Sequence, residues 1–287
     1  LRTLIAIFQS LPPLSKKERL IWEIDQRINQ QGLYIDLDFC RKAKEYVDIE
    51  KSKIQKEFAA ITGGLNPRSR PKMLAWFKKQ GADIPNTKKT TLGALLHHPG
   101  LKPEVERAIT LMEQGNKTST SKYTAALLRS KANGLVREMF AYFGAHTGRW
   151  AARGIQLHNL PRPIDGYTSD LIISILMLFD YETFGFYYSD INKALSVALR
   201  GMIVPKPGQR LFVADFSQME NRIVAWLAGV DWKLEAFKKG IDPYKLIAAT
   251  IYGVKLEDVT DDQRFVGKVA ELSLQYCGGI NAFAKMC

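Results

Sequence analysis

Two groups of residues in this chain have types and spacing that could do chemistry. The first is the run Asp215-Phe216-Ser217-Gln218-Met219-Glu220, which directly follows the apolar residues 211–214. A short apolar run bounded by turn residues is typical of a buried strand, so we expect a strand over 211–214 with Asp215 at its end. A carboxylate there is costly to desolvate unless it is paired or binds a metal, which makes Asp215 a candidate for chemistry.

A structural interpretation of the same stretch is open at this point. Ser217 and Glu220 have the spacing of a capping box, in which each side chain accepts a hydrogen bond from a backbone amide at the start of a helix. The residues 221–227 continue with a helical pattern. In this interpretation Glu220 is structural and Asp215 is an ordinary turn carboxylate, and other parts of the chain must decide.

The second group recurs every four residues near the end of the chain. Arg264, Lys268, Leu272 and Tyr276 form one slowly curving stripe if this segment is helical, because four residues advance about 400° around a helix. The two cations repel each other by about 0.2–0.5 kcal/mol. Glu271 could reach Lys268, or an external anion could offset the repulsion. The stripe therefore offers two phosphate contacts, an apolar contact and an aromatic ring to a nucleoside triphosphate; a solvated face with a packed Tyr276 is the alternative.

The elements that precede these groups are expected to be helical. Ser15 and Glu18 have capping-box spacing, and Gly32 should end the helix that they begin. The short extended piece 33–35 leads to a long helix that begins at Asp36 or Asp38 and ends at 63–64. Shorter helices follow over 73–80, from a cap at Thr90 or Thr91 to 97–98, over 104–114 and around 127–129.

Several polar loops have the groups that bind phosphate. The tracts 66–72 and 116–122 combine backbone amides with hydroxyls and cations, among them Lys117 and Lys122. Polar side chains that could grip a strand also lie close together in a Gly-punctuated segment, namely Arg149, Gln156 and Asn159.

The second half of the chain is expected to mix short strands and helices. Residues 135–143 could form a strand or a buried helix, and 162–200 reads as a helical insertion without chemistry. Helices are also expected over 232–239, after Asp242 and from 260 to 276, where Thr260 and Gln263 have capping-box spacing.

Composition narrows the class of protein. The 287 residues suffice for two or three domains, and 46% of them are hydrophobic, so the chain can bury a core. The net charge of +12 suits a polyanionic partner such as nucleic acid. No apolar run approaches the roughly 20 residues of a membrane helix. The three cysteines and four histidines show no metal spacing, which favours reduced thiols in the cytoplasm and argues against zinc.

Taken together, the motifs resemble those of family A DNA polymerases, the class of bacterial DNA polymerase I and its phage relatives. The pattern D-x-S-x-x-E is met by 215–220, and R-x-x-x-K-x(7)-Y is met by Arg264, Lys268 and Tyr276. The T-G-R segment is met by 147–149, and Q-x-x-N-x-P by 156–161. The resemblance covers roughly 15–287 and is closest to the phage-type branch.

This resemblance implies an α+β, predominantly helical fold of the right-hand polymerase type. The segment 1–14 would be a linker, 15–134 the thumb and its supporting helices, 135–220 part of the palm with the insertion 162–200, and 221–287 part of the fingers. The implied partners are primer-template DNA and dNTPs, and the implied location is the cytoplasm, that of the host if the chain is phage-encoded.

The resemblance also implies a role for each motif residue. Asp215 would bind two Mg²⁺ ions, or Mn²⁺, beside the backbone carbonyl of Phe216, and Lys268 would protonate the departing pyrophosphate. Glu220 would close the sugar pocket against a 2′-hydroxyl. The implied nucleotide contacts are Arg264, Lys268, Leu272, Tyr276, Glu220, Gln218 and Tyr244, and the implied DNA contacts include Arg149, Gln156, Asn159 and Thr147, with Lys117 and Lys122 expected from their loop.

Some positions depart from the family pattern. Leu272 stands where Phe or Tyr is usual, Tyr244 where many members have His, and Cys277 where Gly often follows the Tyr. The family's second metal-binding Asp is expected well beyond Tyr276 and is not found in these residues, so we expect activity to need a further C-terminal polymerase segment. A DNA-binding fragment without chemistry is the alternative function. A single-subunit RNA polymerase is a third possibility, against which Glu220 argues.

Overall fold

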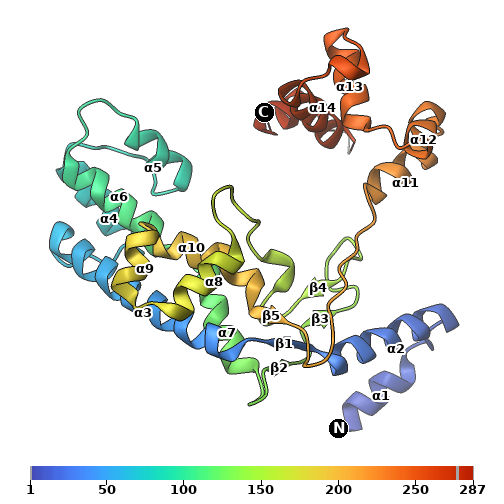
Figure 1. The fold of residues 1–287 in the computed structure, drawn as a ribbon, viewed down its shortest axis with the longest axis horizontal. Helices are drawn as coiled ribbons and strands as arrows, with labels where there is room; N and C mark the ends of the chain where they lie inside the picture. Colours follow the sequence, from blue (N-terminus) through green and yellow to red (C-terminus); the bar gives the residue numbers. More distant parts are fainter. Residues whose placement is uncertain (1, 276–277, 287) are drawn as a thin grey trace. The chain divides into compact units, whose positions relative to one another are not determined.

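The computed structural model of this chain describes residues 2–275 and 278–286 and is mainly helical (Figure 1). The chain divides into two compact units, 1–211 and 212–287. The described helices and strands of the first unit are α1 (Arg2–Ser10), α2 (Lys16–Gln31), β1 (Leu33–Ile35), α3 (Leu37–Thr62), α4 (Arg70–Lys79), α5 (Lys89–Leu96), α6 (Pro103–Gly115), α7 (Ser121–Arg129), β2 (Leu135–Val136), β3 (Phe140–Ala141), β4 (Ala151–Ala152), α8 (Ser169–Leu178), α9 (Tyr181–Tyr187), α10 (Ile191–Ala198) and β5 (Ile203–Val204).

The second unit is described as five helices with loops between them. They are α11 (Met219–Leu227), α12 (Asp231–Lys238), α13 (Pro243–Tyr252), α14 (Asp261–Leu274) and α15 (Ile280–Met286). The expected α+β, predominantly helical class is confirmed, because the strands of the described residues are two or three residues long.

Helix ends follow the capping residues closely. The Ser15 hydroxyl accepts from the Glu18 amide at the start of α2, and the Asp36 carboxylate accepts from the Phe39 amide at the start of α3. Gly32 ends α2 with a φ of 67°, a left-handed value that glycine adopts without steric cost. The cap expected at Thr90 or Thr91 is wrong: α5 begins earlier, after Lys88.

A three-stranded antiparallel sheet lies at the centre of the first unit. Its order is β2-β1-β5, with Leu33 opposite Val136 and Tyr34 opposite Val204. The ambiguous segment 135–143 contains two separate short strands, β2 and β3, and β3 pairs with β4 in a second, two-stranded sheet.

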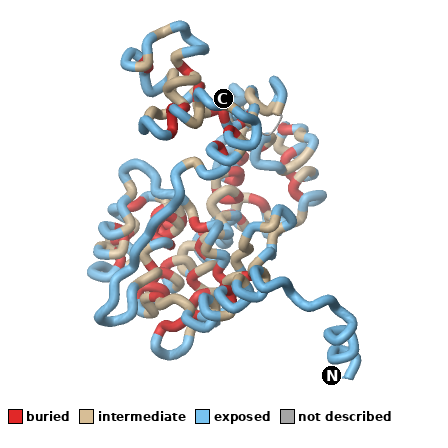
Figure 2. The backbone as a smooth tube through the Cα atoms, turned by 90° about the vertical axis from the view of Figure 1, so that its right-hand side faces the viewer, coloured by how far each residue is buried: buried red, intermediate tan, exposed pale blue. Residues whose placement is uncertain are grey.

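Two hydrophobic cores support the first unit (Figure 2). One lies between the N-terminal part of α3, α7 and the helices α8 to α10, where the fully buried side chains include Phe39, Tyr123, Leu176, Phe184 and Leu195. The other lies between the C-terminal part of α3 and the helices α4 to α6. The segment 162–200 is therefore helical as expected, and its helices complete the larger core.

Cys40 is a free thiol in the larger core. Burial, and to a lesser extent the Asp36 carboxylate, raises its pKa to about 12. A thiol with this pKa stays protonated at neutral pH and is unreactive.

The strand expected over 211–214 is wrong. The structure shows this segment as irregular backbone in which Phe212 and Val213 are 92% and 95% exposed. A strand requires a neighbour that takes its backbone hydrogen bonds, and no strand in the described part of the chain pairs with this segment. The apolar residues of this segment are thus exposed rather than buried.

The helices of the second unit pack through small residues and an ion pair. A Cβ atom at Gly267 on α14 would lie 2.3 Å from the Tyr244 carbonyl oxygen on α13, so glycine permits the close approach of these helices. The Lys233 ammonium on α12 pairs with the Glu271 carboxylate on α14, and both side chains are largely buried.

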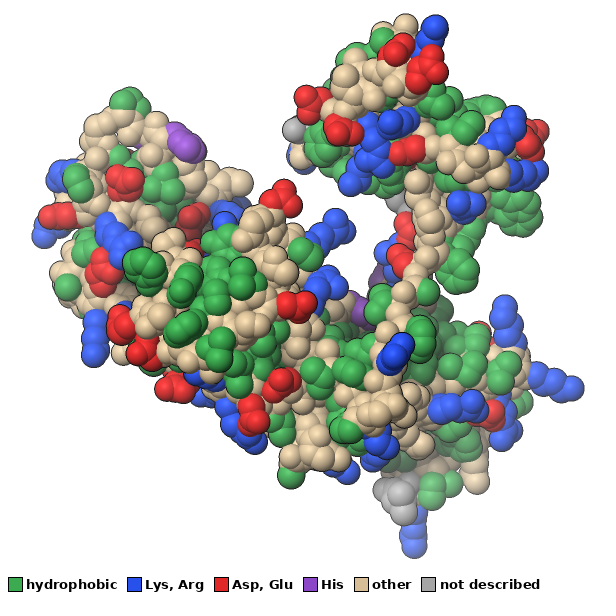
Figure 3. All heavy atoms as spheres, viewed as in Figure 1, with side chains coloured by type: hydrophobic (Ala, Val, Ile, Leu, Met, Phe, Trp, Pro, Cys, Tyr) green, Lys and Arg blue, Asp and Glu red, His purple; other side chains and the backbone are tan. Residues whose placement is uncertain are grey.

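The basic composition of the chain is visible on its surface. Lys and Arg side chains are spread over the visible face rather than gathered in one patch (Figure 3). Among the described residues, no helix is both long enough and apolar enough to cross a membrane.

Candidate nucleotide and nucleic-acid site

The start of α11 differs from the expected capping box. Its N-cap is Gln218 in the left-handed region, with a φ of 53°, and the Gln218 side chain makes no capping hydrogen bond. The Ser217 carbonyl oxygen instead accepts a hydrogen bond from Arg222 Nε at 2.9 Å. The prediction that Ser217 and Glu220 form a capping box is therefore wrong, because the chain turns one residue later than a Ser217 cap requires.

Gln218 is held in this strained conformation by its own helix. Asn221, which is 5% exposed, donates from Nδ2 to Gln218 Oε1 at 3.1 Å. A non-glycine residue at positive φ is costly and persists where surrounding contacts fix it. Such positions are frequent at functional sites, which agrees with the expected place of Gln218 in the nucleotide site.

Asp215 is available to bind a ligand. It is exposed, and its carboxylate makes no hydrogen bond or ion pair with any residue that the structure describes. Phe216, whose backbone carbonyl is the other expected metal contact, is 76% exposed. Glu220 is also exposed, at the first turn of α11.

The helix α14 is fixed at its start by a complete capping box. Thr260 Oγ1 accepts from the Gln263 amide at 3.3 Å, and Gln263 Oε1 accepts from the Thr260 amide at 3.1 Å. This prediction is confirmed. The cap sets the position of the first cation of the stripe, Arg264, in the turn that follows.

Arg264 is engaged by two residues at the start of α13. Its Nε donates to Asp242 Oδ2 at 2.6 Å, and its guanidinium lies 5.5 Å from the centre of the Tyr244 ring. Burial, followed by the nearby Glu271 and Asp242 carboxylates, raises the pKa of Tyr244. Arg264 and Tyr244 therefore lie together, as expected for two residues of one nucleotide site.

Lys268 and Leu272 continue the stripe along α14. Lys268 is half-buried and makes no hydrogen bond or ion pair with the described residues, and Leu272 is 36% exposed. The expected contact between Glu271 and Lys268 is absent, because Glu271 pairs with Lys233 instead. Lys268 therefore retains its charge for a ligand, whereas Tyr276 lies outside the described residues.

The polar residues expected to grip DNA lie in and after one hairpin of the first unit. Thr147 and Arg149 are exposed in the loop that joins β3 and β4. Gln156 and Asn159 are exposed in the segment that follows β4, where Gln156 adopts a φ of 54°. The four residues are all exposed, in the two consecutive segments on either side of β4.

The two lysines of the 116–122 tract have internal partners. The Lys117 ammonium pairs with Asp190, the N-cap of α10. Lys122 Nζ donates to the carbonyl oxygens of Ile155 at 2.8 Å and Gln156 at 3.3 Å, and burial lowers its pKa. Lys122 therefore positions the backbone of Gln156, a role that its sequence context does not reveal.

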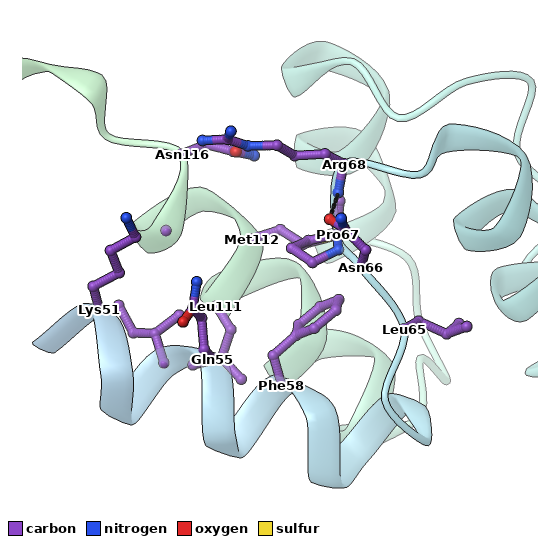
Figure 4. A pocket seen from close by; sticks show the side chains of 12 residues that line it. Lys51, Gln55, Phe58, Leu65, Asn66, Pro67, Arg68, Leu111, Met112 and Asn116 are labelled. Carbon is purple, nitrogen blue, oxygen red and sulfur yellow. Dashed lines mark hydrogen bonds between the residues drawn. The ribbon is translucent and has the colours of Figure 1, made fainter.

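The first residues of the two loop tracts that were expected to meet phosphates, 66–68 and Asn116, line one pocket (Figure 4). Its volume is about 360 Å³. Arg68 and Asn116 lie at one rim and Lys51 stands on α3 at the other side, above a floor that includes Phe58 and Met112. Tracts about 50 positions apart in sequence thus contribute to the same polar rim.

Asp215, together with the backbone of Phe216, could hold a divalent metal. Its carboxylate and the Phe216 carbonyl are hard oxygen donors of the kind that Mg²⁺ binds. Within 2–275 and 278–286, however, no group of three or more His, Cys, Asp or Glu side chains could hold a metal ion. The donors fit the metal, but they require further oxygens from substrate, water or another polypeptide segment.

The fold and these motifs define a polymerase-type protein. The family model described as DNA polymerase family A matches residues 38–286, and the chain belongs to this family. The matched range includes both Asp215 and the helix α14.

Individual relatives agree with this assignment. The chain is 33% identical to the DNA polymerase of Bacillus phage SP02 over 278 residues, which cover 96% of this chain and 42% of the relative. It is 24% identical to DNA polymerase I of Pseudomonas aeruginosa, over 97% of this chain and 29% of the relative. The chain thus spans less than half the length of these curated relatives.

A solved structure shows the same fold. The polymerase domain of Pol1 from M. smegmatis, in complex with DNA primer-template and dNTP, matches with a TM-score of 0.61 at 20% identity. The match covers 88% of this chain and 41% of that chain.

Proposed function

We propose that this chain is the part of a template-directed DNA polymerase that binds primer-template and dNTP and supplies one of the catalytic carboxylates. The observation that carries the proposal is the exposed Asp215 in a family A chain whose α14 presents Arg264 and Lys268. The phage relative supports a place of action in the cytoplasm of a bacterial host.

In this proposal the cationic stripe binds the triphosphate of the incoming nucleotide. Arg264 and Lys268 are one helical turn apart, so both can contact one polyphosphate chain. Lys268 makes no ion pair with the described residues and can donate a proton to the departing pyrophosphate as a general acid. Leu272 offers an apolar contact on the same helix, and Tyr244 lies beside Arg264.

Residues of α11 are proposed to recognise the sugar. Glu220, in the first turn of the helix, excludes a 2′-hydroxyl from a closed pocket, and Gln218 fixes the entry to the helix. Excluding one polar group from a tight pocket discriminates strongly, because the pocket leaves that group without a partner.

The loop region after β3 is proposed to contact the primer-template near its end. Thr147, Arg149, Gln156 and Asn159 are exposed there. Lys122 contributes by fixing the carbonyl of Gln156, and Lys117 by tying its loop to Asp190.

A divalent metal is proposed to bind at Asp215 and the Phe216 carbonyl. Mg²⁺ is the expected ion, two in the complete site, and Mn²⁺ is a substitute; when bound, these ions lower the pKa of the primer 3′-hydroxyl and stabilise the charge of the leaving group. We propose that the remaining carboxylate comes from a C-terminal polymerase segment outside these 287 residues, since the relatives are more than twice as long.

Primer extension tests the proposal. The chain is incubated with primed template, dNTPs and Mg²⁺, alone and together with a C-terminal polymerase segment that carries a second metal-binding carboxylate. We expect extension when the segment is present and at least about 1,000-fold less with Asp215→Ala, because one of two metal-binding carboxylates is lost. Asp165→Ala, a change at an exposed carboxylate of the first unit, is the matched control.

The outcomes distinguish the alternatives. Robust extension by the chain alone contradicts the need for the segment. Salt-dependent DNA binding without extension in any arm identifies a DNA-binding fragment instead. Equal use of dNTPs and rNTPs removes the proposed role of Glu220 and favours an RNA polymerase.

A further inference from the structure

A second basic pocket lies in the first unit, at one end of the three-stranded sheet. Because β1 runs antiparallel to both of its neighbours, the start of β1 and the ends of β2 and β5 lie at the same end of the sheet. The cavity at this end has a volume of about 290 Å³. This is at the lower end of the roughly 300–1,000 Å³ typical of small-ligand pockets.

The side chains around this cavity carry one sign of charge. Its lining includes the cations Arg137, Lys206 and Arg210 and the amides of Gln30, Gln31 and Gln209, and it contains no carboxylate. The three cations are exposed, and none of them pairs with a carboxylate of the described residues. Three unpaired cations around one cavity repel each other, so an anion with several negative charges binds there favourably.

The backbone fixes Arg137 at the cavity. The glycine that ends α2, Gly32, lies against the stem of Arg137: a Cβ atom at Gly32 would lie 3.0 Å from Arg137 Cγ and 2.2 Å from the Val136 carbonyl oxygen. The next residue, Glu138, adopts a φ of 57° and donates its amide to the Asn29 carbonyl oxygen at 3.2 Å. The end of α2 thus contacts the residues on both sides of Arg137, namely Val136 and Glu138, and the stem of Arg137 itself.

A tight turn brings the other cations to the same cavity. The Gln209 amide donates to the Lys206 carbonyl oxygen at 2.9 Å across Pro207 and Gly208, and Gly208 has a φ of 78°. Proline followed by glycine at positive φ is the pattern of a type II turn. The turn begins at Lys206 and ends at Gln209, so that Lys206 and the next residue, Arg210, both lie at the cavity beside the end of β5.

We infer that this pocket, defined by Arg137, Lys206, Arg210 and the neighbouring glutamines, is a second phosphate-binding site, separate from the cations of α14. Arginine forks and glutamine amides donate several hydrogen bonds to phosphate oxygens, and lysine adds a point charge. The ligand is a chain of linked phosphates, either the backbone of a single-stranded nucleic acid or a free polyphosphate.

Binding assays with two probes test this site on the full chain. The affinity for a fluorescein-labelled single-stranded 12-nucleotide DNA is measured by anisotropy, and that for inorganic tripolyphosphate by calorimetry. The variant R137Q/K206Q/R210Q removes the three cations of the pocket. The control R2Q/K16Q/R27Q removes three exposed cations of α1 and α2 from the same unit, with the same change in net charge.

We expect the pocket variant to bind at least one of the two probes at least tenfold more weakly, and the control variant to change affinity less than about twofold. For the DNA, each lost phosphate contact lowers the salt dependence of log K by about 0.7, so the slope should fall by about two in the pocket variant alone. Weaker binding of DNA alone assigns the pocket to a strand, and weaker binding of tripolyphosphate assigns it to a free polyphosphate.

Equal losses in the two triple variants overturn the inference, because they show a general effect of net charge. An unchanged affinity of the pocket variant for both probes also overturns it. The variant R264Q/K268Q separates this pocket from the proposed nucleotide site. A loss of dNTP binding in R264Q/K268Q tests the proposed function. The difference in affinity between the two triple variants tests the second pocket, and it does not depend on dNTP binding.

Discussion

At the scale of single residues, Arg264, which we propose to bind the triphosphate, is already held by an ion pair with Asp242. The carboxylate of Asp242 accepts two hydrogen bonds. Its Oδ1 accepts one from the Tyr244 amide at the start of α13, and its Oδ2 accepts one from Arg264. The ion pair orients the guanidinium, but its negative charge also competes with a triphosphate for Arg264. Nucleotide affinity should therefore reflect a balance between orientation and competition.

Asp242→Asn tests this balance. The amide oxygen can still cap α13, but the charge that opposes a triphosphate is removed, so we expect dNTP affinity to rise about 1.4- to 5-fold. This range follows from the roughly 0.2–1 kcal/mol that a partly exposed ion pair contributes. Nucleotide titration monitored by calorimetry measures it. Asp242→Ala, which also removes the cap, should lower the stability of α13, and a fall in affinity with Asp242→Asn would show that orientation outweighs competition.

Gly267 permits the close packing of α13 and α14 in the same unit. Gly267→Ala places a methyl group 2.3 Å from the Tyr244 carbonyl oxygen, so α13 and α14 must separate. We expect a loss of roughly 1–3 kcal/mol, typical of overpacking, and faster hydrogen exchange in both helices. Gly93→Ala is the matched control, because this glycine of α5 has open space around it and alanine should stabilise the helix by roughly 0.5–1 kcal/mol. Equal exchange in Gly267→Ala and the parent chain would contradict the tight packing.

At the scale of elements, α3 and α6 are joined by a bidentate ion pair. Arg107 donates from Nε and Nη2 to the two carboxylate oxygens of Glu57, each at 2.6 Å. These hydrogen bonds hold the pKa of Glu57 below its usual value of 4.5. A carboxylate whose pKa is lower in the folded state stabilises the fold above its unfolded pKa, and this contribution is lost as the pH falls through the folded value.

The pH dependence of unfolding tests this pair. Glu57→Gln should lower the melting temperature at pH 7, and the difference from the parent chain should shrink as the pH falls below about 4.5, where the carboxylate becomes protonated. The effect at pH 7 is below about 1 kcal/mol, because both side chains are nearly half exposed. Glu45→Gln, at an exposed position of the same helix, is the control. A difference that stays constant from pH 7 to pH 3 would rule out the electrostatic origin.

The start of a helix could be predicted from the sequence where a single capping side chain determines it. Ser15, Asp36 and Thr260 each cap the helix that their spacing predicts, because capping is a local interaction. The strand expected over 211–214 could not be read in this way. Its formation depends on a hydrogen-bonding neighbour from elsewhere, and an apolar run does not encode whether that neighbour is present.

The candidate site was predictable to a similar extent. The regular spacing of Arg264, Lys268 and Leu272 placed them on one helix, and that helix is present. The ion pair of Arg264 with Asp242 joins residues from different helices, and the bond from Lys122 to the Ile155 carbonyl joins residues 33 positions apart. Such contacts depend on tertiary packing, which residue types alone do not specify.

At the scale of the whole molecule, the boundary between the two compact units follows Leu211. Next to it, residues 205–217 are exposed and irregular, apart from one turn, and they include Arg210. Proteases cleave exposed, irregular backbone in preference to helices, since the cleaved segment must extend into the active site of the protease. The link between the units should therefore be the first place to be cut.

Limited trypsin digestion tests this division. We expect the earliest cut after Arg210, because trypsin cleaves poorly at Lys206, which precedes Pro207, and the products should be fragments 1–210 and 211–287. Arg210→Gln should delay the appearance of both fragments, whereas the control Arg27→Gln, an exposed position on α2, should leave their rate unchanged. Mass spectrometry of the first products identifies the cut. First cleavage within α3 or α14 would show that these helices open more readily than the link, and would contradict the division into two stable units.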